Sequence, residues 1–533
     1  MKKILSFLLA AIMIVAVMSP AAFAAEAEEL PMVYVEGQGI GLVRPDGTKV
    51  YPLEADFAAL VKDELMPMWK EVVQGVVTGD YSAYCDKLCD IMIPIFSDMK
   101  LGKDGEPTDG SGIRPGNKWR GEGNLNNIKG TITSTTERYP VYRWHYDWRL
   151  SPLELAAELD ELIDAVLAET NATKVNLVSR CLGSNIAYAY LHTYGTDKVN
   201  SSIFYVPPID GVGMVNALFT GEIELDAAAV ERFVSYYQDE QNIVIKDEAT
   251  TDLIMALIEL LEQTKVLGVG IDIYQKIVDK IQVEALPRIL RESFGTCLTY
   301  WSMVSADKYE QAKEFVFGKE PDAEWAEFIK KIDAYHEIQK DSREFIQSLE
   351  SKIGVAVIGK YGLPAVPISA DASEESDLYM STKLMSFGAT CCDLDKKFSN
   401  KYINKAKEAG TDKYISVDRK IDASTCALPD KTWFIKDLAH SDFPDCVNDL
   451  ILAFIRSDGT MTVNSDPRFT QYLQYKAATQ DTAESITPIL TMDDTHDTTA
   501  KYAKGPLSAL LRFMNKLLSF LRVFLANLSA KEK

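Results

Sequence analysis

Cys181 stands where a strand turns sharply into a helix, a place from which a side chain can act as a nucleophile. An apolar strand is expected over 175–178 and a helix over 182–194. Ser179 and Gly183, two residues before and two after Cys181, are small, as the close approach of strand and helix requires. The helix N-terminus favours a thiolate through its dipole and free N–H groups. The spacing predicts a reactive cysteine that attacks a carbonyl carbon; a buried structural thiol is the alternative.

The elements around Cys181 alternate between strands and helices, and one helical block interrupts them. Strands are expected at 32–35, 139–144, 175–178, 202–206, 355–359 and 432–436, and helices at 153–169, 182–194 and 446–455. Such alternation is typical of a mostly parallel sheet. The sequence therefore predicts the α/β class: a mostly parallel sheet flanked by helices, with an inserted helical cap.

Composition and pattern divide the chain into six segments. They are a signal peptide (1–24), the first part of the sheet domain (25–209), a helical cap (210–350), the second part of the sheet domain (351–460), a polar linker or surface segment (461–505) and a basic amphipathic helix (506–533). The first segment joins two lysines, an apolar run and a small-residue cleavage site ending at Ala24. We therefore expect a secreted or envelope-associated protein, cleaved near Ala24.

The charge of the chain changes sign at its C-terminal end. Residues 506–533 carry five basic residues against one acidic residue, beside a wide apolar face. A helix of this kind either lies on a membrane surface or docks on the body of the protein. The whole chain is acidic, because 56 basic and 78 acidic residues give a net charge of −22. This charge argues against nucleic acid as the main partner.

The strand, turn and helix around Cys181 (residues 175–194) are called the elbow below. One motif before the elbow indicates a family resemblance. The run Tyr146–Pro152 reads Y-D-W-R-L-S-P and is followed by an amphipathic helix. With this run and the elbow, the chain resembles the α/β-hydrolase superfamily, and within it the lecithin–cholesterol acyltransferase and lipase branch. Ser179, Cys181 and Ser184 depart from the family's Gly, Ser and Gly. The resemblance implies an α/β-hydrolase fold, acyl-ester chemistry, and a substrate-binding role for Trp148.

The same resemblance implies an oxyanion hole at the end of the first strand. The strand and Gly-rich turn at 31–41 resemble the family's oxyanion loop. Backbone N–H groups of Leu182 and of Gln38 or Gly39 are expected to bind the developing oxyanion.

His440 is the histidine that chain order selects as the base. On this fold the nucleophile comes first, the acid next and the histidine last. His440 follows a strand and precedes a helix, as family histidines do. The other four precede the elbow, lie on its helix, lie in the cap, or lie in an acidic segment beyond the last core helix: His145, His192, His336 and His496.

Three aspartates compete for the acid position. The run Asp418–Ser424 resembles the family's acid loop, with Arg419 in place of Gly. Asp377 follows a strand and competes with Asp418, and Asp422 is a third option. We expect Asp418 to be the acid that fixes the imidazole tautomer, with Asp377 as the alternative.

The cysteines other than Cys181 form no recognisable framework. Their spacing repeats no module, and no CxxC pair faces a second pair, so we expect neither a metal site nor a cofactor. The sequence thus supports an exported lipase- or acyltransferase-like enzyme that acts on acyl lipids or other esters through a Cys–His–Asp triad and a thioester. The alternative is an inert hydrolase fold that serves as a lipid-binding or envelope-interaction module.

Overall fold

The structure is a computed structural model that describes residues 29–38, 41–51, 64, 66–108, 113–115, 125–238 and 271–495. The predicted signal peptide, 1–24, and the predicted basic helix, 506–533, both lie outside these ranges. Export and membrane contact therefore stay predictions. Among the described residues, no helix combines the length and apolar character needed to cross a bilayer.

A nine-stranded sheet lies at the centre of the fold, in the order β14-β13-β12-β9-β8-β7-β1-β6-β5. The edge strands β5 and β14 are antiparallel to their neighbours, and the other neighbouring pairs are parallel. The strands are β1 (Met32–Val35), β5 (Lys129–Thr133), β6 (Arg138–Trp144), β7 (Val175–Arg180), β8 (Val199–Tyr205), β9 (Gly354–Tyr361), β12 (Thr432–Lys436), β13 (Tyr472–Lys476) and β14 (Ser485–Pro488).

Helices bury the central strands on both faces. Strand β1 is buried throughout and β7 along nearly all its length, as expected where helices cover both sides of a parallel sheet. Helix α5 (Pro152–Thr170) packs on α6 (Leu182–Tyr194), and α17 (Asp445–Arg456) contacts β5 and β14. A capping box formed by Ser151 and Glu154 begins α5. The predicted α/β class is confirmed, and the architecture is α/β-hydrolase-like.

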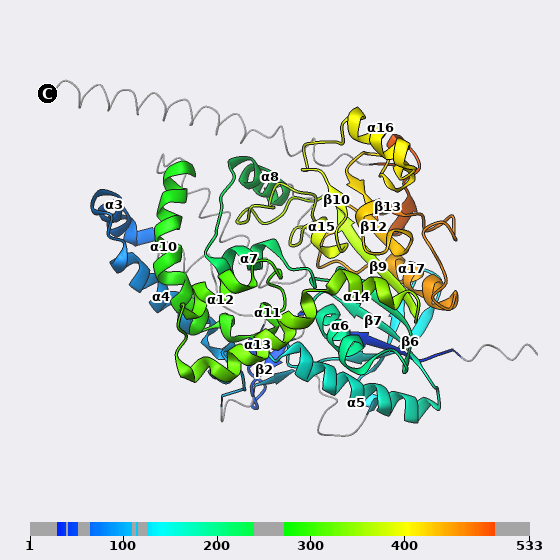
Figure 1. Cartoon of the computed structure of the whole chain (residues 1–533), viewed down its shortest axis with the longest axis horizontal. Coiled ribbons are helices and arrows are strands. Elements are labelled where there is room, and N and C mark those ends of the chain that lie inside the picture. The colour runs from blue at the N-terminus through cyan, green and yellow to red at the C-terminus, as the bar shows by residue number, and fades with distance from the viewer. Residues whose placement is uncertain are drawn as a thin grey trace, which may run out of the picture.

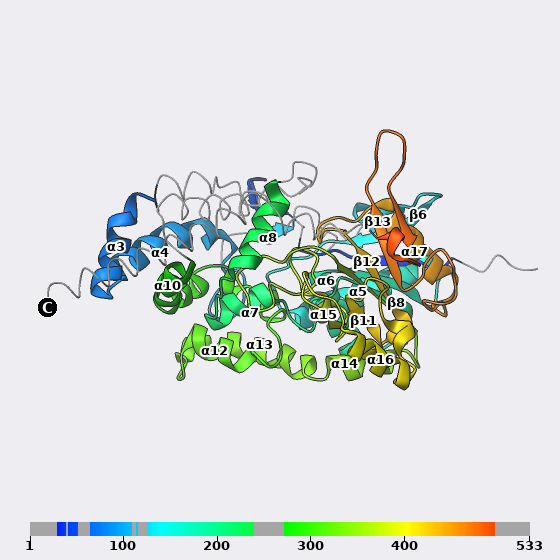
Figure 2. The ribbon, with the colours of Figure 1, turned by 90° about the horizontal axis from the view of Figure 1, so that it is seen from above.

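A helical segment separates β8 from β9. It contains α7 (Gly213–Thr220), α8 (Ala227–Gln238), α10 (Ile271–Arg291), α11 (Leu298–Trp301), α12 (Tyr309–Phe317), α13 (Ala326–Gln339) and α14 (Ser342–Leu349). Helix α10 packs on α4 (Ser82–Phe96), which follows α3 (Trp69–Thr78). Figures 1 and 2 show α3, α4 and α10 together at the end of the molecule away from the sheet.

Two segments differ from the sequence-based expectation. The segment 461–505 was expected to be a linker or surface segment, but it supplies β13 and β14 to the sheet. Strand β5 is not among the strands expected from the sequence. β5 and β14 are edge strands that are less buried than the central strands, so their hydrophobic pattern is weak.

Candidate active site

Cys181 adopts a backbone conformation that few residues other than glycine adopt. Its φ is 47° and its ψ is −127°, between the last residue of β7 and the first of α6. Such a conformation costs about 1–3 kcal/mol and persists only where the surroundings enforce it. Here the Cys181 N–H donates to the Tyr205 carbonyl at 2.9 Å, and the Cys181 carbonyl accepts from the Ser184 N–H at 2.8 Å. The sharp turn raises the thiol to the end of the sheet.

Close backbone contacts explain the small residues around Cys181. A Cβ on Gly183 would lie 2.4 Å from the Glu36 carbonyl oxygen, so this position admits glycine alone without a backbone shift. A Cβ on Gly37 would lie 3.1 Å from the Cys181 Cβ. The turn after β1 therefore passes directly over the elbow.

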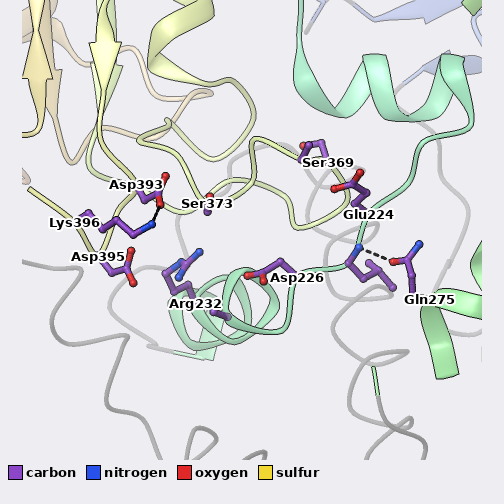
Figure 3. Close-up of a pocket in the computed structure, with 12 residues that line it drawn as sticks. Glu224, Asp226, Arg232, Gln275, Ser369, Ser373, Asp393, Asp395 and Lys396 are labelled. Carbon is purple, nitrogen blue, oxygen red and sulfur yellow. Dashed lines mark hydrogen bonds and ion pairs between the residues drawn. The ribbon is translucent and has the colours of Figure 1, made fainter. Parts of the chain in front are cut away.

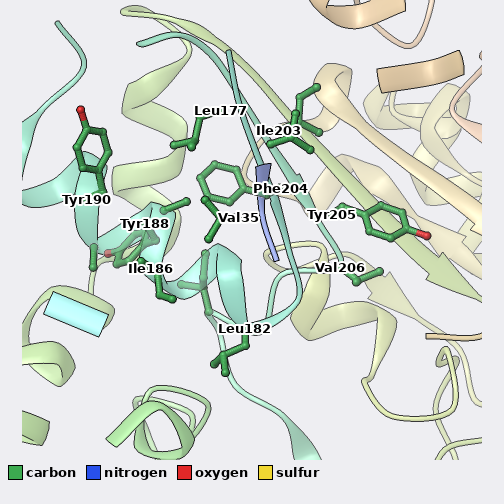
Figure 4. Packing of buried hydrophobic residues seen from close by; sticks show 14 of the residues in the cluster. Val35, Leu177, Leu182, Ile186, Tyr188, Tyr190, Ile203, Phe204, Tyr205 and Val206 are labelled. Carbon is green, nitrogen blue, oxygen red and sulfur yellow. The ribbon is translucent and has the colours of Figure 1, made fainter. Parts of the chain in front are cut away.

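Two buried serines, Ser179 and Ser184, fit the elbow. The Ser179 hydroxyl lies 3.2 Å from both the Ser184 Oγ and the Ile203 carbonyl oxygen, and both serine side chains are fully buried. Their polar atoms are thus satisfied, which removes the usual cost of burying a hydroxyl. Figure 4 shows the surrounding apolar cluster, in which Val35, Leu182 and Phe204 hold the elbow.

A chain of two hydrogen bonds joins Cys181 to a carboxylate through His440. The His440 Nε2 lies 3.1 Å from the Cys181 Sγ, and the Nδ1 lies 2.6 Å from the Asp377 Oδ2. The backbone N–H of His440 also donates to the backbone carbonyl of Asp377 at 2.9 Å. His440 lies in the loop after β12, and Asp377 lies in the loop after β9. The structure thus brings together three residues that the sequence singled out.

Asp418, the preferred acid, lies elsewhere. Its Oδ1 accepts from the Ser416 hydroxyl at 2.7 Å, and its Oδ2 lies 3.7 Å from the Lys436 Nζ. Asp422 accepts from the Tyr402 hydroxyl at 2.8 Å. Both aspartates therefore stabilise their own segment, and the hydrogen bond to His440 comes from Asp377, the alternative. The preference for Asp418 is corrected on this geometry.

The surroundings of Cys181 favour its thiolate. Burial acts to raise the pKa of this thiol, but the His440 charge and hydrogen bond, the nearby Arg180 charge and the Leu182 N–H together lower it below its ordinary value. The Leu182 N–H begins α6, so it contributes as a free helix N-terminus does.

The pKa values of His440 and Asp377 are shifted in the directions that favour the charged form of each group. Burial acts to lower the pKa of His440, yet Asp377 and Cys181 raise it to about 9. Burial acts to raise the pKa of Asp377, but His440, Lys360 and the Met380 N–H lower it. The shifts at Cys181 and His440 both favour the thiolate–imidazolium form, and the shift at Asp377 favours its carboxylate.

Of the expected oxyanion donors, Leu182 lies beside Cys181. The Leu182 N–H is directed to Cys181. Gln38 lies in the turn after β1, and its side-chain amide donates to the Tyr300 hydroxyl. Gly39 lies outside the described residues. A further donor from the turn therefore stays a prediction.

Trp148 lies inside the fold rather than on a binding surface. It is fully buried, with its ring 5.1 Å from that of Tyr51 and 5.9 Å from that of Tyr300. It supports Tyr300 from behind, so its side chain presents no surface to a ligand here. The neighbouring Asp147 and Arg149 form a largely buried ion pair at 2.6 Å.

The remaining histidines and cysteines have other surroundings. His336 stacks on Tyr309, with centroids 3.9 Å apart, and His496 lies outside the described residues. All eight cysteines lie in described ranges and are free thiols. Within the described part of the chain, no group of three or more His, Cys, Asp or Glu side chains could hold a metal ion.

A polar cavity of about 640 Å³ lies beside α8. Figure 3 shows Asp226 and Arg232 on one side of it and Asp393 and Lys396 on another, with Gln275 from α10 nearby. None of the described residues that line it belongs to the Cys181–His440–Asp377 group.

The structure also shows a neighbour of His440 that sequence reasoning missed. Lys360 lies fully buried near the end of β9 and donates to backbone carbonyls of the His440 loop. The sequence could have indicated this residue, because Lys360 is a lysine within an otherwise apolar stretch, Val355–Tyr361. A charged residue inside a buried strand needs compensating partners, and such partners frequently belong to a functional site.

Comparison with known protein families gives no match, and comparison with curated proteins gives none. Among solved structures, the chain is similar to one in the crystal structure of the Tle4–Tli4 complex. The TM-score is 0.28 and the identity 11%, over 62% of this chain and 74% of that chain. This similarity is too low to support a functional argument, so the geometry of the site carries the proposal that follows.

Proposed function

We propose that this protein is a cysteine-dependent acyl hydrolase or acyltransferase. The observation that carries the proposal is the hydrogen-bonded line from the Cys181 Sγ through His440 to Asp377, at 3.1 and 2.6 Å. A nucleophile, a base within hydrogen-bond reach and a group that orients the base form the arrangement that covalent acyl transfer needs. The acute elbow at Cys181 supports the same chemistry.

In the proposed reaction, the Cys181 thiolate attacks the carbonyl carbon of an ester. The carbonyl electrons move to oxygen, where the Leu182 N–H stabilises the negative charge. As the tetrahedral intermediate collapses, the ester C–O bond breaks, and the His440 imidazolium gives its proton to the departing alkoxide. A thioester on Cys181 and a free alcohol result.

The second half of the reaction regenerates the enzyme. Neutral His440 removes a proton from water or from an acceptor hydroxyl, whose oxygen attacks the thioester. The C–S bond breaks, and the thiolate returns to its imidazolium partner. Asp377 stabilises the imidazolium at each stage and holds Nδ1 as a donor. Acyl-lipid esters are the substrate class that the family resemblance implies.

The test is the intact mass of folded, reduced protein after brief exposure to a p-nitrophenyl ester and a short-chain thioester. We expect one acyl adduct on the wild type and none on Cys181→Ala. Cys297→Ala is the matched control, because it removes a different buried thiol, and we expect it to keep the adduct. Turnover that survives Cys181→Ala would contradict the proposal. Folded wild-type protein with neither adduct nor turnover would favour a lipid-binding or envelope-interaction module.

A further inference from the structure

The loop that carries His440 has an unusual set of backbone partners. The Lys360 Nζ lies 2.6 Å from the Ala439 carbonyl oxygen, 3.1 Å from that of His440 and 2.8 Å from that of Asp442. An ammonium group has three N–H donors, so these three carbonyls can satisfy all of them. Hydrogen bonds with a charged donor are about twice as strong as neutral ones, so this loop is held firmly.

Arg180 binds the one carbonyl of residues 439–442 that Lys360 does not contact. Its Nη2 donates to the Ser441 carbonyl at 2.6 Å, and its guanidinium lies 5.6 Å from the centre of the Phe443 ring. Carbonyls 439 to 442 therefore each accept from a cationic side chain. Arg180 directly precedes Cys181, so this contact ties the histidine loop to the elbow itself.

Neither Lys360 nor Arg180 forms an ion pair with a carboxylate. Among the described residues, no carboxylate oxygen lies within 4.0 Å of the Lys360 Nζ or the Arg180 guanidinium. The groups that face Lys360 from further away are Asp377, Asp442, Cys181 and Arg180, together with the Tyr205 ring 4.8 Å away. Burial lowers the pKa of Lys360 to about 7, although the Asp377 charge acts to raise it, so holding the charged form of Lys360 here has a cost.

We propose that Lys360 and Arg180 act as a cationic clamp, a pair of positioning residues that hold the His440 loop against the elbow and keep positive charge beside the Cys181 thiolate. The inference rests on the proposed function, because it assigns these residues to the same Cys181–His440 pair. Neither residue contacts the reacting atoms, so each acts through His440 and through its field. Arg180 lowers the pKa of Cys181, and Lys360 lowers that of Asp377.

The test compares two buried lysines that both donate to backbone carbonyls. Lys360→Met removes the clamp, whereas Lys431→Met removes a lysine that binds the carbonyls of Gly459 and Met461 instead. The readout is the rate at which iodoacetamide alkylates Cys181 as a function of pH, with thermal unfolding measured beside it. A rise of one unit in the Cys181 pKa would move the alkylation profile one unit to higher pH. We expect a shift of about that size for Lys360→Met and none for Lys431→Met.

Arg180 supplies the second arm if Lys360→Met does not fold. Arg180→Gln is expected to shift the alkylation profile to higher pH, and Arg180→Lys, which keeps the charge, is expected to restore most of it. Wild-type profiles in folded Lys360→Met and Arg180→Gln, or an equal shift in Lys431→Met, would overturn the inference. Alkylation needs no ester substrate, so absent ester turnover would refute the proposed function while this profile still tests the clamp.

Discussion

Two turns of this molecule carry a cysteine with similar local sequence and opposite chemistry. Cys181 and Cys297 each precede a leucine that begins a helix, and each has a small residue two positions earlier. Each also lies near an arginine, Arg180 in one case and Arg149 in the other. The pKa of Cys181 is lowered, whereas burial raises that of Cys297 far above its ordinary value.

The partners of the two sulfur atoms explain the difference. The Cys297 Sγ donates its proton to the Met99 carbonyl at 3.5 Å, a bond that only the neutral thiol can make. Arg149 is bound to Asp147 through two of its nitrogens, and the Asp147 charge opposes the lowering effect of Arg149 on the Cys297 pKa. Helix α11 has four residues, which gives a weak dipole.

The comparison teaches which features activate a thiol. A helix start and a neighbouring arginine are common to both turns and are insufficient. Cys181 differs because an imidazole accepts its proton and because Arg180 binds a neutral carbonyl rather than a carboxylate. Activation therefore depends chiefly on His440, which the fold brings from 259 positions away, and the local turn alone is insufficient.

The largest expected effect is a difference between the alkylation rates of Cys181 and Cys297. We expect iodoacetamide at neutral pH to modify Cys181 at least ~10³ times faster than Cys297, because Cys297 is both protonated and fully buried. Peptide mapping by mass spectrometry after timed alkylation measures both rates. Comparable rates in folded protein would show that the two turns do not differ as described.

Removing the imidazole should make Cys181 behave more like Cys297. We expect His440→Ala to lower kcat/KM for a p-nitrophenyl ester by about 10³-fold, because the thiolate loses its counter-charge and the reaction loses its general acid and base. The absorbance of the thiolate near neutral pH should fall in parallel. A His440→Ala variant with undiminished turnover would remove His440 from the mechanism.

The acid assignment is tested by a matched pair of isosteric changes. We expect Asp377→Asn to lower kcat/KM by about 10²-fold or more, because the amide cannot stabilise the imidazolium. Asp418→Asn should leave kcat/KM within about twofold, since it alters a hydrogen bond far from the reacting atoms and affects stability alone. Steady-state kinetics and thermal unfolding of both variants give the answer. The reverse ranking would restore Asp418 as the acid.

We expect kcat/KM to rise and then fall with increasing pH, with both changes determined by the Cys181–His440 pair. On the acidic side, kcat/KM rises as Cys181 loses its proton, and this limb lies below the ordinary thiol pKa because His440 and Arg180 lower it. On the alkaline side, kcat/KM falls as His440 loses its proton, around pH 9. A profile that rises steadily past pH 10 would mean that a neutral imidazole suffices.

The smallest effect concerns Ser179, a buried serine of the elbow. Ser179→Gly removes two buried hydrogen bonds, so we expect a loss of about 1–2 kcal/mol in the free energy of unfolding. Turnover should change by less than about threefold, because Ser179 lies beneath the elbow and contacts no reacting group. Chemical denaturation with parallel kinetics measures both quantities. A large loss of turnover would indicate that Ser179 shapes the site.

Local sequence patterns predicted the elements that form the elbow and the histidine loop. The helix over 182–194 begins and ends where expected, and the strand before it continues two residues further, to Arg180. His440 followed from chain order and its position between a strand and a helix. These features are local, since each depends on hydrophobic periodicity or on a turn whose geometry needs small residues.

Local sequence patterns could not predict which aspartate contacts His440, or the strands at the edges of the sheet. The loop after β9 folds back on itself, with the Leu363 N–H donating to the Ser376 carbonyl, and this places Asp377 against His440. The run beginning at Asp418 has the more familiar pattern, but the Lys436 Nζ and the Ser416 hydroxyl hold that aspartate in place. Long-range contacts decide between such candidates, and a motif cannot.

The distance along the chain between Cys181 and His440 sets the order in which a growing chain becomes reactive. The base follows the nucleophile by 259 residues. At roughly 5–20 residues per second, translation reaches His440 some 13–50 s after Cys181 has been made. During that interval Cys181 has only the weak acidity of an unpartnered cysteine. The pKa of the Cys181 thiol is therefore lowered only at a late stage of assembly, once His440 has been made and lies against it.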